Sequence, residues 1–219
     1  MGYVHLRPIC VHLRFQSISL NRIVIASNNP GKVRELRALM EPLGIEAVPQ
    51  SDFAVTEAEE PHFTFLENAL AKARHASTMT GLPALADDSG LCVSALFGEP
   101  GVHSAHYAGK DGSREERDAR NNAKLVEQMR AAVDASAFYY CVLVLLRHAD
   151  DPTPIVAAGT WHGEIVLEPR GRNGFGYDPY FLPRESGLTA AELPAEEKNR
   201  VSHRGKALAA LAAKLRGEA

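Results

Sequence analysis

Two adjacent carboxylates, Asp87 and Asp88, follow the apolar run 82–86 and precede Ser89 and Gly90. Carboxylates at the end of an apolar strand are costly to bury unless a cation or strong hydrogen-bond donors compensate their charge. A hard divalent ion such as Mg²⁺ takes carboxylate and phosphate oxygens together. Because successive residues of a strand point to opposite faces, we expect the two carboxylates to have different roles. A turn or a helix N-cap is the alternative, since DDSG is also typical of turns.

The polar segment 27–32 joins a short β-branched run to a helical pattern. Unpaired N–H groups and partial positive charge at a helix N-terminus attract phosphate, and the lysine of this segment adds a full charge. It is not a Walker A loop, because GxxxxGK[ST] requires an earlier glycine and a Ser or Thr after the lysine. A capped turn without a ligand is the alternative. The candidate phosphate-binding residues are Ser27, Asn28, Asn29, Pro30, Gly31 and Lys32.

An acidic cluster, Glu57, Glu59 and Glu60, precedes a helical pattern that contains Lys72. Such a cluster is usually solvated and interacts favourably with the helix dipole. It could instead supply a further carboxylate to a metal at Asp88, and Lys72 could bind phosphate from within a cleft. Surface charge is the alternative for both features.

The segment 171–179, GRNGFGYDP, combines three glycines with two aromatic side chains. Glycines let the backbone approach a ligand closely, and the rings of Phe175 and Tyr177 offer flat faces for stacking on a base. Asp178 can accept hydrogen bonds from a purine edge or brace the loop. The combination favours a nucleobase pocket, with a tight hairpin loop as the alternative.

Near the C-terminus, Ser202 is placed to cap the last helical pattern, which leaves His203 and Arg204 in its first turn. A cation in the first turn of a helix opposes the helix dipole. We therefore expect a local anion, such as a phosphate or a base carbonyl, to compensate it.

The elements that must position these residues alternate between strand and helix patterns. This alternation predicts an α/β fold with a mixed central sheet flanked by helices, and we interpret residues 21–219 as a single domain of two lobes. Strands are predicted at 22–26, 45–48, 82–86 and 138–147, with one or two antiparallel strands in 155–167, split near Gly159 or Gly163. Helices are predicted at 32–43, from Thr64 to Gly81, and at 114–133, 195–199 and 203–216.

Composition excludes several classes of protein. A formal net charge of −3 gives no basic face for non-specific nucleic-acid binding, and no stretch approaches the roughly 18 apolar residues of a membrane span. The cysteines Cys10, Cys92 and Cys141 lack CxxC spacing, which favours buried thiols in a reducing compartment and a cytoplasmic protein. Residues 1–20 lack the apolar core and cleavage site of a signal peptide, so we interpret them as a poorly ordered extension or an over-long gene start.

These segments together resemble the inosine triphosphate pyrophosphatase family, whose members act on non-standard purine nucleoside triphosphates. They occur in the family's order over residues 22–216, and DDSG and FGYDP make the bacterial form the more similar one. The matching stretches are SNNPGKVREL, EEPHFTFLENALAKARHA, PALADDSGL, PGVHSAHYAG, NGFGYDPYF and AAELPAEEKNRVSHRGKAL.

The resemblance implies a homodimer whose subunits have two lobes with a long substrate cleft between them. It implies that Asp88 is the general base and a ligand of Mg²⁺, with Glu59 as its acidic partner at the metal. The segment 27–32 and Lys72 would hold the triphosphate, and Ser89 would touch the substrate.

The implied reaction is attack of water on the α-phosphorus of ITP, dITP or XTP, which gives the nucleoside monophosphate and pyrophosphate. The base pocket would be formed by Phe175, Gly176, Tyr177 and Asp178, and the 6-oxo side of the purine would be read by Lys198, His203 and Arg204. Two alternatives remain. One is a pyrophosphatase for other modified nucleotides, and the other is a nucleotide-binding regulator without turnover.

Overall fold

The computed structural model describes residues 20–217. The predicted N-terminal extension, residues 1–20, lies outside the described residues except for Leu20, which packs against the core. The strands are β1 (Arg22–Ile25), β2 (Glu46–Pro49), β3 (Ala84–Val93), β4 (Ser136–Leu146), β5 (Ile155–Ile165) and β6 (Phe181–Pro183). The α-helices are α1 (Pro30–Met40), α2 (Phe65–Thr80), α3 (Arg114–Met129), α4 (Ala195–Val201) and α5 (His203–Arg216). The 3-10 helices are η1 (Glu41–Leu43), η2 (Gln50–Phe53), η3 (Ser94–Leu96), η4 (Gly101–His106) and η5 (Asp178–Tyr180).

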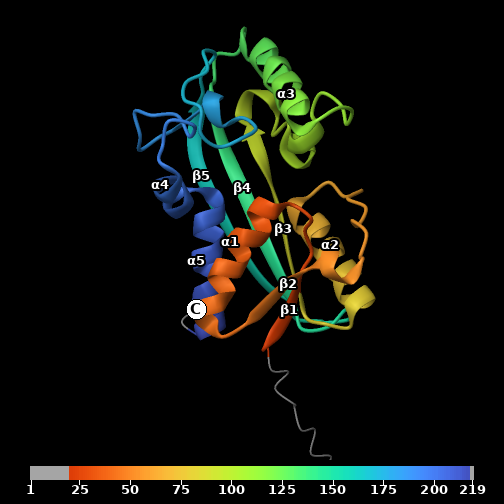
Figure 1. Ribbon diagram of the computed structural model, residues 1–219. Helices are drawn as coiled ribbons and strands as arrows, with labels where there is room; N and C mark the ends of the chain where they lie inside the picture. The colour runs from red at the N-terminus through yellow and green to blue at the C-terminus, as the bar shows by residue number, and fades with distance from the viewer. Residues whose placement is uncertain (1–19, 218–219) are drawn as a thin grey trace, which may run out of the picture.

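A six-stranded sheet in the order β2-β1-β3-β4-β5-β6 forms the centre of the molecule. β1 is parallel to β2 and β3, whereas the pairs β3–β4, β4–β5 and β5–β6 are antiparallel. α1 and α5 cover one face of the sheet and α2 covers the other, while α3 lies toward the opposite end of the sheet from β1 and β2 (Figure 1). The predicted α/β fold with a mixed sheet is confirmed. Within residues 20–217, no helix is long and apolar enough to cross a bilayer.

Alternation of side chains along the strands divides the core between the two faces of the sheet. Leu85 belongs to the cluster that packs against α1 and α5, whereas Ala86 belongs to the cluster that packs against α2. The next two residues of β3 continue this alternation, so Asp87 faces α1 and α5 and Asp88 faces α2. The predicted separation of the two carboxylates is confirmed.

β3 is longer than the predicted strand 82–86, and the sequence DDSG lies within it rather than in a turn after it. β4 supplies an antiparallel partner along its whole length, from Ala84 opposite Leu146 to Val93 opposite Ala137. Gly90 is required by close packing instead of by a turn, because a Cβ at this position would lie 2.4 Å from the Gly101 carbonyl oxygen and 2.4 Å from Ser104 Oγ. The approach of η4 to β3 therefore explains this glycine.

β5 is one continuous strand, so the split considered near Gly159 or Gly163 does not occur. A Cβ on Gly159 would lie 2.2 Å from the carbonyl oxygen of His203, and one on Gly163 would lie 2.5 Å from that of Leu182. These glycines thus admit the backbone of α5 and of β6 against the strand. β6 was not predicted, because its three residues carry no periodic pattern and are ordered by pairing with the end of β5.

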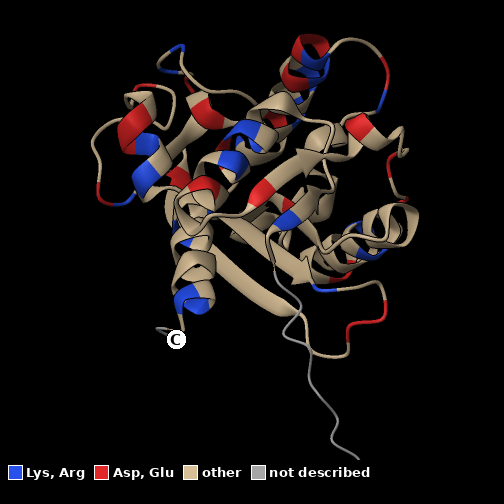
Figure 2. Ribbon diagram, turned by 60° about the horizontal axis from the view of Figure 1, so that its bottom comes forward, with Lys and Arg blue, Asp and Glu red and all other residues tan. Residues whose placement is uncertain are grey.

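Local capping residues set several helix ends where the sequence predicted them. α2 follows Thr64, whose Oγ1 accepts a hydrogen bond from the Glu67 N–H at 3.2 Å, and it ends at Gly81 with φ of 68°. α3 has a complete capping box between Ser113 and Glu116 and ends at Met129, four residues before the predicted boundary of 133. Acidic and basic residues are interleaved along this helix (Figure 2).

Candidate active site

The carboxylate of Asp87 is buried and faces two cations. Its Oδ2 lies 2.8 Å from Lys32 Nζ and 3.8 Å from a guanidinium nitrogen of Arg204. Burial alone would raise the pKa of Asp87, but the positive charges of Lys32 and Arg204 outweigh it and lower the pKa to about 2. Asp87 is therefore ionised and holds together the first turns of α1 and α5.

The carboxylate of Asp88 lies on the opposite face, where its Oδ1 is 3.1 Å from Lys72 Nζ. Lys72 also contacts Glu60 Oε2 at 3.2 Å. Burial raises the pKa of Asp88, and the charge of Glu60 adds to this effect although Lys72 opposes it. The pKa of Lys72 is raised because the surrounding carboxylates outweigh the effect of its own burial, so the lysine is charged.

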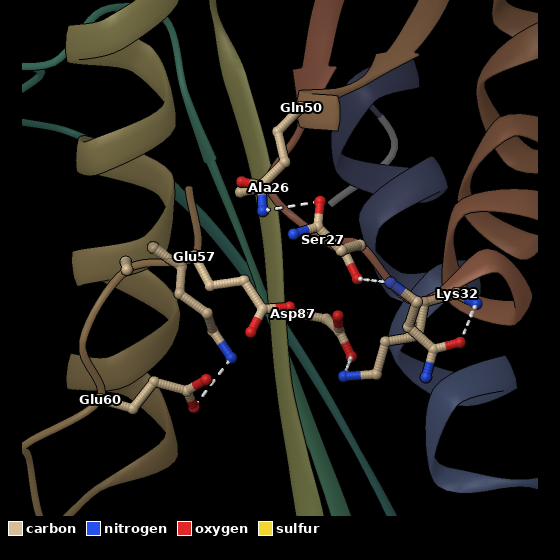
Figure 3. A pocket seen from close by; sticks show the side chains of 11 residues that line it. Ala26, Ser27, Lys32, Gln50, Glu57, Glu60 and Asp87 are labelled. Atoms are coloured by element: carbon tan, nitrogen blue, oxygen red, sulfur yellow. Dashed lines mark hydrogen bonds and ion pairs between the residues drawn. The ribbon is translucent and has the colours of Figure 1, made fainter. Parts of the chain in front are cut away.

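A cavity of about 140 Å³ lies where α1, β3 and the segment before α2 meet. Figure 3 shows Lys32 reaching toward Asp87 from α1, with Glu57 and Glu60 approaching from the other side. Pockets that enclose a whole drug-sized ligand usually exceed about 300 Å³. The cavity therefore suits one part of a nucleotide, such as its phosphate groups.

The predicted phosphate-binding segment 27–32 borders this cavity through Ser27, Asn28, Asn29 and Lys32. α1 begins at Pro30, and Asn29 caps it by accepting hydrogen bonds from the N–H groups of Gly31 and Lys32 at 3.0 and 3.4 Å. Two helix N–H groups are thus already paired with a side chain. The positively charged side chains that line the cavity, and so can bind a phosphate there, are those of Lys32 and Lys72.

The carboxylates can accommodate a magnesium ion. Asp88 Oδ2 and Asp87 Oδ1 are buried and have no hydrogen-bond partner among the described residues. No group of three His, Cys, Asp or Glu side chains within residues 20–217 could hold a metal by itself. Mg²⁺ usually binds through one or two carboxylates together with substrate phosphates and water, so the carboxylates of this site fit it.

The two candidate glutamates differ in position. Both side chains are exposed, but Glu60 lines the cavity and contacts Lys72, whereas Glu59 does not line the cavity. The assignment of Glu59 to the metal stays a prediction, and the position of Glu60 at the cavity makes Glu60 the better candidate.

The loop 171–178 forms a second cluster of candidate residues. Asp178 is buried, accepts a hydrogen bond from the Phe175 N–H at 2.8 Å and pairs with Lys198 of α4. Phe175 is 48% exposed, so its ring is partly accessible for stacking on a base, beside the guanidinium of Arg114 at 4.4 Å from the ring centroid. Tyr177 is instead buried in the core and donates a hydrogen bond to the Ser104 carbonyl at 2.9 Å, so its ring is not free to stack.

The first turn of α5 connects the two clusters. Ser202 caps this helix, as predicted, by accepting a hydrogen bond from the Gly205 N–H at 3.2 Å. Arg204 donates a hydrogen bond to Ser89 Oγ at 3.3 Å and pairs with Asp87 and Glu35. Carboxylates of the protein itself therefore compensate its charge, where the sequence suggested a phosphate or a base carbonyl.

His203 stacks on the Tyr139 ring with 4.7 Å between the ring centroids. Its Nδ1 is buried without a hydrogen-bond partner among the described residues. Burial, assisted by the neighbouring Arg204 and Lys198 charges, lowers the pKa of His203 well below its usual value. The imidazole is therefore neutral.

Several residues around the site were not predicted. Gln50 of η2 lines the cavity and donates a hydrogen bond to Asn28 Oδ1 at 3.2 Å. Glu35 pairs with Arg204, and Tyr139 stacks on His203. The alternation of the apolar run 138–147 could have placed Tyr139 on the face of α5, but no local signal identifies Gln50 or Glu35.

The sequence of the chain is similar to that of proteins whose family is known. A model of the Ham1 family matches residues 23–214. The chain is 65% identical over 192 residues to a dITP/XTP pyrophosphatase of Nitrosomonas europaea, a match that covers 88% of this chain and 93% of the relative. It is 63% identical over 195 residues to a dITP/XTP pyrophosphatase of Burkholderia pseudomallei, with 89% and 93% covered.

Solved structures agree with these matches. A HAM1 protein from Coxiella burnetii has a TM-score of 0.85 at 47% identity, covering 90% of this chain and 98% of that chain. A nucleoside-triphosphatase or dITP/XTP pyrophosphatase from Mycobacterium abscessus has a TM-score of 0.71 at 45% identity, with 87% and 98% covered.

Proposed function

This chain belongs to the Ham1 family, and we propose that it hydrolyses non-standard purine nucleoside triphosphates, such as dITP, ITP and XTP, to the nucleoside monophosphate and pyrophosphate. Relatives that are 65% and 63% identical over most of the chain are named dITP/XTP pyrophosphatases. The structural observation that carries the proposal is a pair of buried carboxylates, Asp87 and Asp88, that each contact a lysine at the polar cavity.

Asp88 is the candidate general base. Burial raises the pKa of its carboxyl group, which brings the base closer to the pH at which it must accept a proton. Its unpaired Oδ2 is free to accept that proton from water as the water oxygen bonds to the α-phosphorus. The bond from the α-phosphorus to the bridging oxygen breaks, and pyrophosphate leaves with the electron pair. When bound, Mg²⁺ would neutralise phosphate charge and lower the pKa of the attacking water.

Lys32 and Lys72 stabilise the charge that develops on the departing pyrophosphate. Fixed cations that already lie where charge develops require little reorganisation in the transition state. Here the carboxylates of Asp87 and Asp88 hold both ammonium groups in place before substrate binds. Asp87, whose low pKa keeps it ionised, orients Lys32 rather than accepting a proton.

Purine selectivity is assigned to the second cluster, with Phe175 stacking on the base. The neutral His203 and the charged Lys198 are donors for a 6-oxo group, and a 6-amino group would leave such donors unpaired at high cost. The unpaired buried Nδ1 of His203 supports this role. The predicted contact of Arg204 with the base would require it to leave some of its present partners.

The decisive experiment compares kcat/KM for ITP, XTP, GTP and ATP in the presence of Mg²⁺. We expect ITP and XTP to be preferred, and equal values for ITP and ATP would contradict the proposal. Adding dUTP, dCTP and dTTP tests the alternative of a pyrophosphatase for other modified nucleotides. Release of pyrophosphate separates an enzyme from a nucleotide-binding regulator.

We further propose that the protein acts in the cytoplasm as a homodimer, with the substrate lying in a cleft between two lobes. Family resemblance supports the homodimer and the cleft, whereas the buried thiols of Cys92 and Cys141 suit a reducing compartment.

A further inference from the structure

One face of α3 holds the loop that carries Phe175. Arg114, Asp118 and Asn122 are spaced four residues apart, so they lie on the same side of this helix. Asp118 Oδ2 accepts a hydrogen bond from the Gly176 N–H at 3.0 Å, and Asn122 Nδ2 donates one to the Gly176 carbonyl at 2.9 Å. Both backbone polar groups of one glycine are thus bound by side chains of a single helix.

The backbone conformation of Gly176 depends on these two hydrogen bonds. Gly176 has φ of 61°, a left-handed conformation. Glycine adopts this conformation about as readily as it adopts conformations with negative φ. A Cβ built on Gly176 would have no heavy atom within 4 Å, so packing of neighbouring atoms at that position does not fix the conformation of this residue. The two hydrogen bonds from α3 therefore restrict a peptide that glycine would otherwise leave free to rotate.

The neighbouring ring is restrained from the same helix. The guanidinium carbon of Arg114 lies 4.4 Å from the centroid of the Phe175 ring, and Arg114 also approaches Asp118 at 4.0 Å. Asp178 holds the Phe175 N–H from within the loop. Lys198 Nζ of α4 lies 5.1 Å from the same ring centroid. Because Phe175 is half-exposed and not anchored in the core, these contacts with its backbone and its ring hold it in place.

We propose that Asp118 and Asn122 are positioning residues that set purine selectivity by fixing the Gly176 peptide and, through it, the Phe175 ring. This inference rests on the proposed function, in which Phe175 stacks on the base. A loop already held in its binding conformation loses less entropy when the base binds. It also keeps the base in register with the donors that distinguish a 6-oxo from a 6-amino group.

Matched variants separate the hydrogen bond from side-chain size. Asp118→Asn keeps an oxygen that can accept from the Gly176 N–H, whereas Asp118→Leu has a similar size and no acceptor. Asn122→Leu removes the donor to the Gly176 carbonyl. Glu127→Ala serves as a control on α3, because Glu127 is exposed and pairs only with the exposed Arg130 among the described contacts.

We expect D118L and N122L to raise the KM for ITP by roughly tenfold with little change in kcat, and to reduce the ratio of kcat/KM for ITP over ATP. E127A should resemble the unmodified protein in both measurements, and D118N, which keeps the acceptor but loses the charge that faces Arg114 at 4.0 Å, should be clearly less impaired than D118L. The midpoint of thermal unfolding, measured for every variant, confirms that the proteins compared are folded. The D118N result tests the acceptor even where D118L is too unstable to assay.

The same measurements distinguish failure of this positioning role from failure of the proposed function. An unmodified protein that hydrolyses ATP and ITP equally well would overturn the proposed function itself. If the unmodified protein discriminates while folded D118L and N122L keep its KM and its ITP/ATP ratio, the positioning role is wrong. A loss of kcat alone in these variants, or a D118N variant as impaired as D118L, would also overturn it.

Discussion

Asp87 and Asp88 are consecutive residues of β3 whose carboxylates contact lysines on opposite faces of one sheet. Asp87 lies 2.8 Å from Lys32 of α1, and Asp88 lies 3.1 Å from Lys72 of α2. β1 pairs with β3 only as far as Leu85, so the two faces can meet around the end of β1 beside the carboxylates. Ligands of α/β sheets commonly bind beyond the carboxyl ends of parallel strands, and the cavity lies at this position.

Replacing the candidate base should remove chemistry more than binding. In Asp88→Asn, we expect kcat for ITP to fall by about 10²- to 10⁴-fold, because the amide cannot accept the proton of the attacking water. The lysines that we propose to bind phosphate remain, so the dissociation constant for ITP, measured by calorimetry, should change much less. Near-normal turnover in this variant would show that another group is the base.

The proposed magnesium site can be tested by matched substitutions of two adjacent glutamates. Chelation of Mg²⁺ should abolish turnover. Because Glu60 lines the cavity and contacts Lys72 whereas Glu59 does not line it, Glu60→Gln should raise the Mg²⁺ concentration for half-maximal activity by about tenfold or more. Glu59→Gln should leave that concentration within about twofold if it makes no contact with the metal. The opposite pattern would assign the metal to Glu59, as the sequence predicted.

Burial of His203 makes stability depend on pH in a defined direction. The pKa of His203 is lowered in the folded protein below its ordinary value of 6.5. The unfolded chain therefore binds a proton that the folded chain does not, so the free energy of unfolding decreases as the pH falls below about 6.5. Above this pH the imidazole is neutral in both states and has no such effect.

Substitution of this histidine isolates its contribution. In His203→Gln, the loss of unfolding free energy between pH 7 and pH 5, measured by urea denaturation, should be smaller than in the unmodified protein. The difference can reach at most about 1.4 kcal/mol for each pH unit. Equal slopes for the two proteins would mean that the folded imidazole titrates normally.

Close packing of η4 on β3 predicts a large effect from a single methyl group. Gly90→Ala would place its Cβ 2.4 Å from the Gly101 carbonyl oxygen. The resulting overpacking should destabilise the fold by roughly 1–3 kcal/mol, which thermal or urea unfolding would measure. Gly187→Ala is the matched control, because a Cβ there has no heavy atom within 4 Å. Similar unfolding midpoints for the two variants would argue against the close approach.

The sequence alone determined the features that depend on near neighbours in the chain. α2 follows Thr64 and ends at Gly81, and Ser202 caps α5, because capping involves residues only three or four positions apart. The family and its proposed chemistry were also recognisable from the sequence, since the separate motifs keep their residue types and order. The chain's membership of the Ham1 family confirms that resemblance.

Only the tertiary structure decided which distant segments approach one another. The sequence DDSG satisfies a turn as well as a strand, and its place within β3 results from pairing with β4 about fifty residues later. Likewise, Arg204 reaches Ser89 across 115 residues, and α3 binds the peptide of Gly176 across 54 and 58 residues. Local sequence cannot specify these contacts, because their partners are selected by how the sheet and its helices pack.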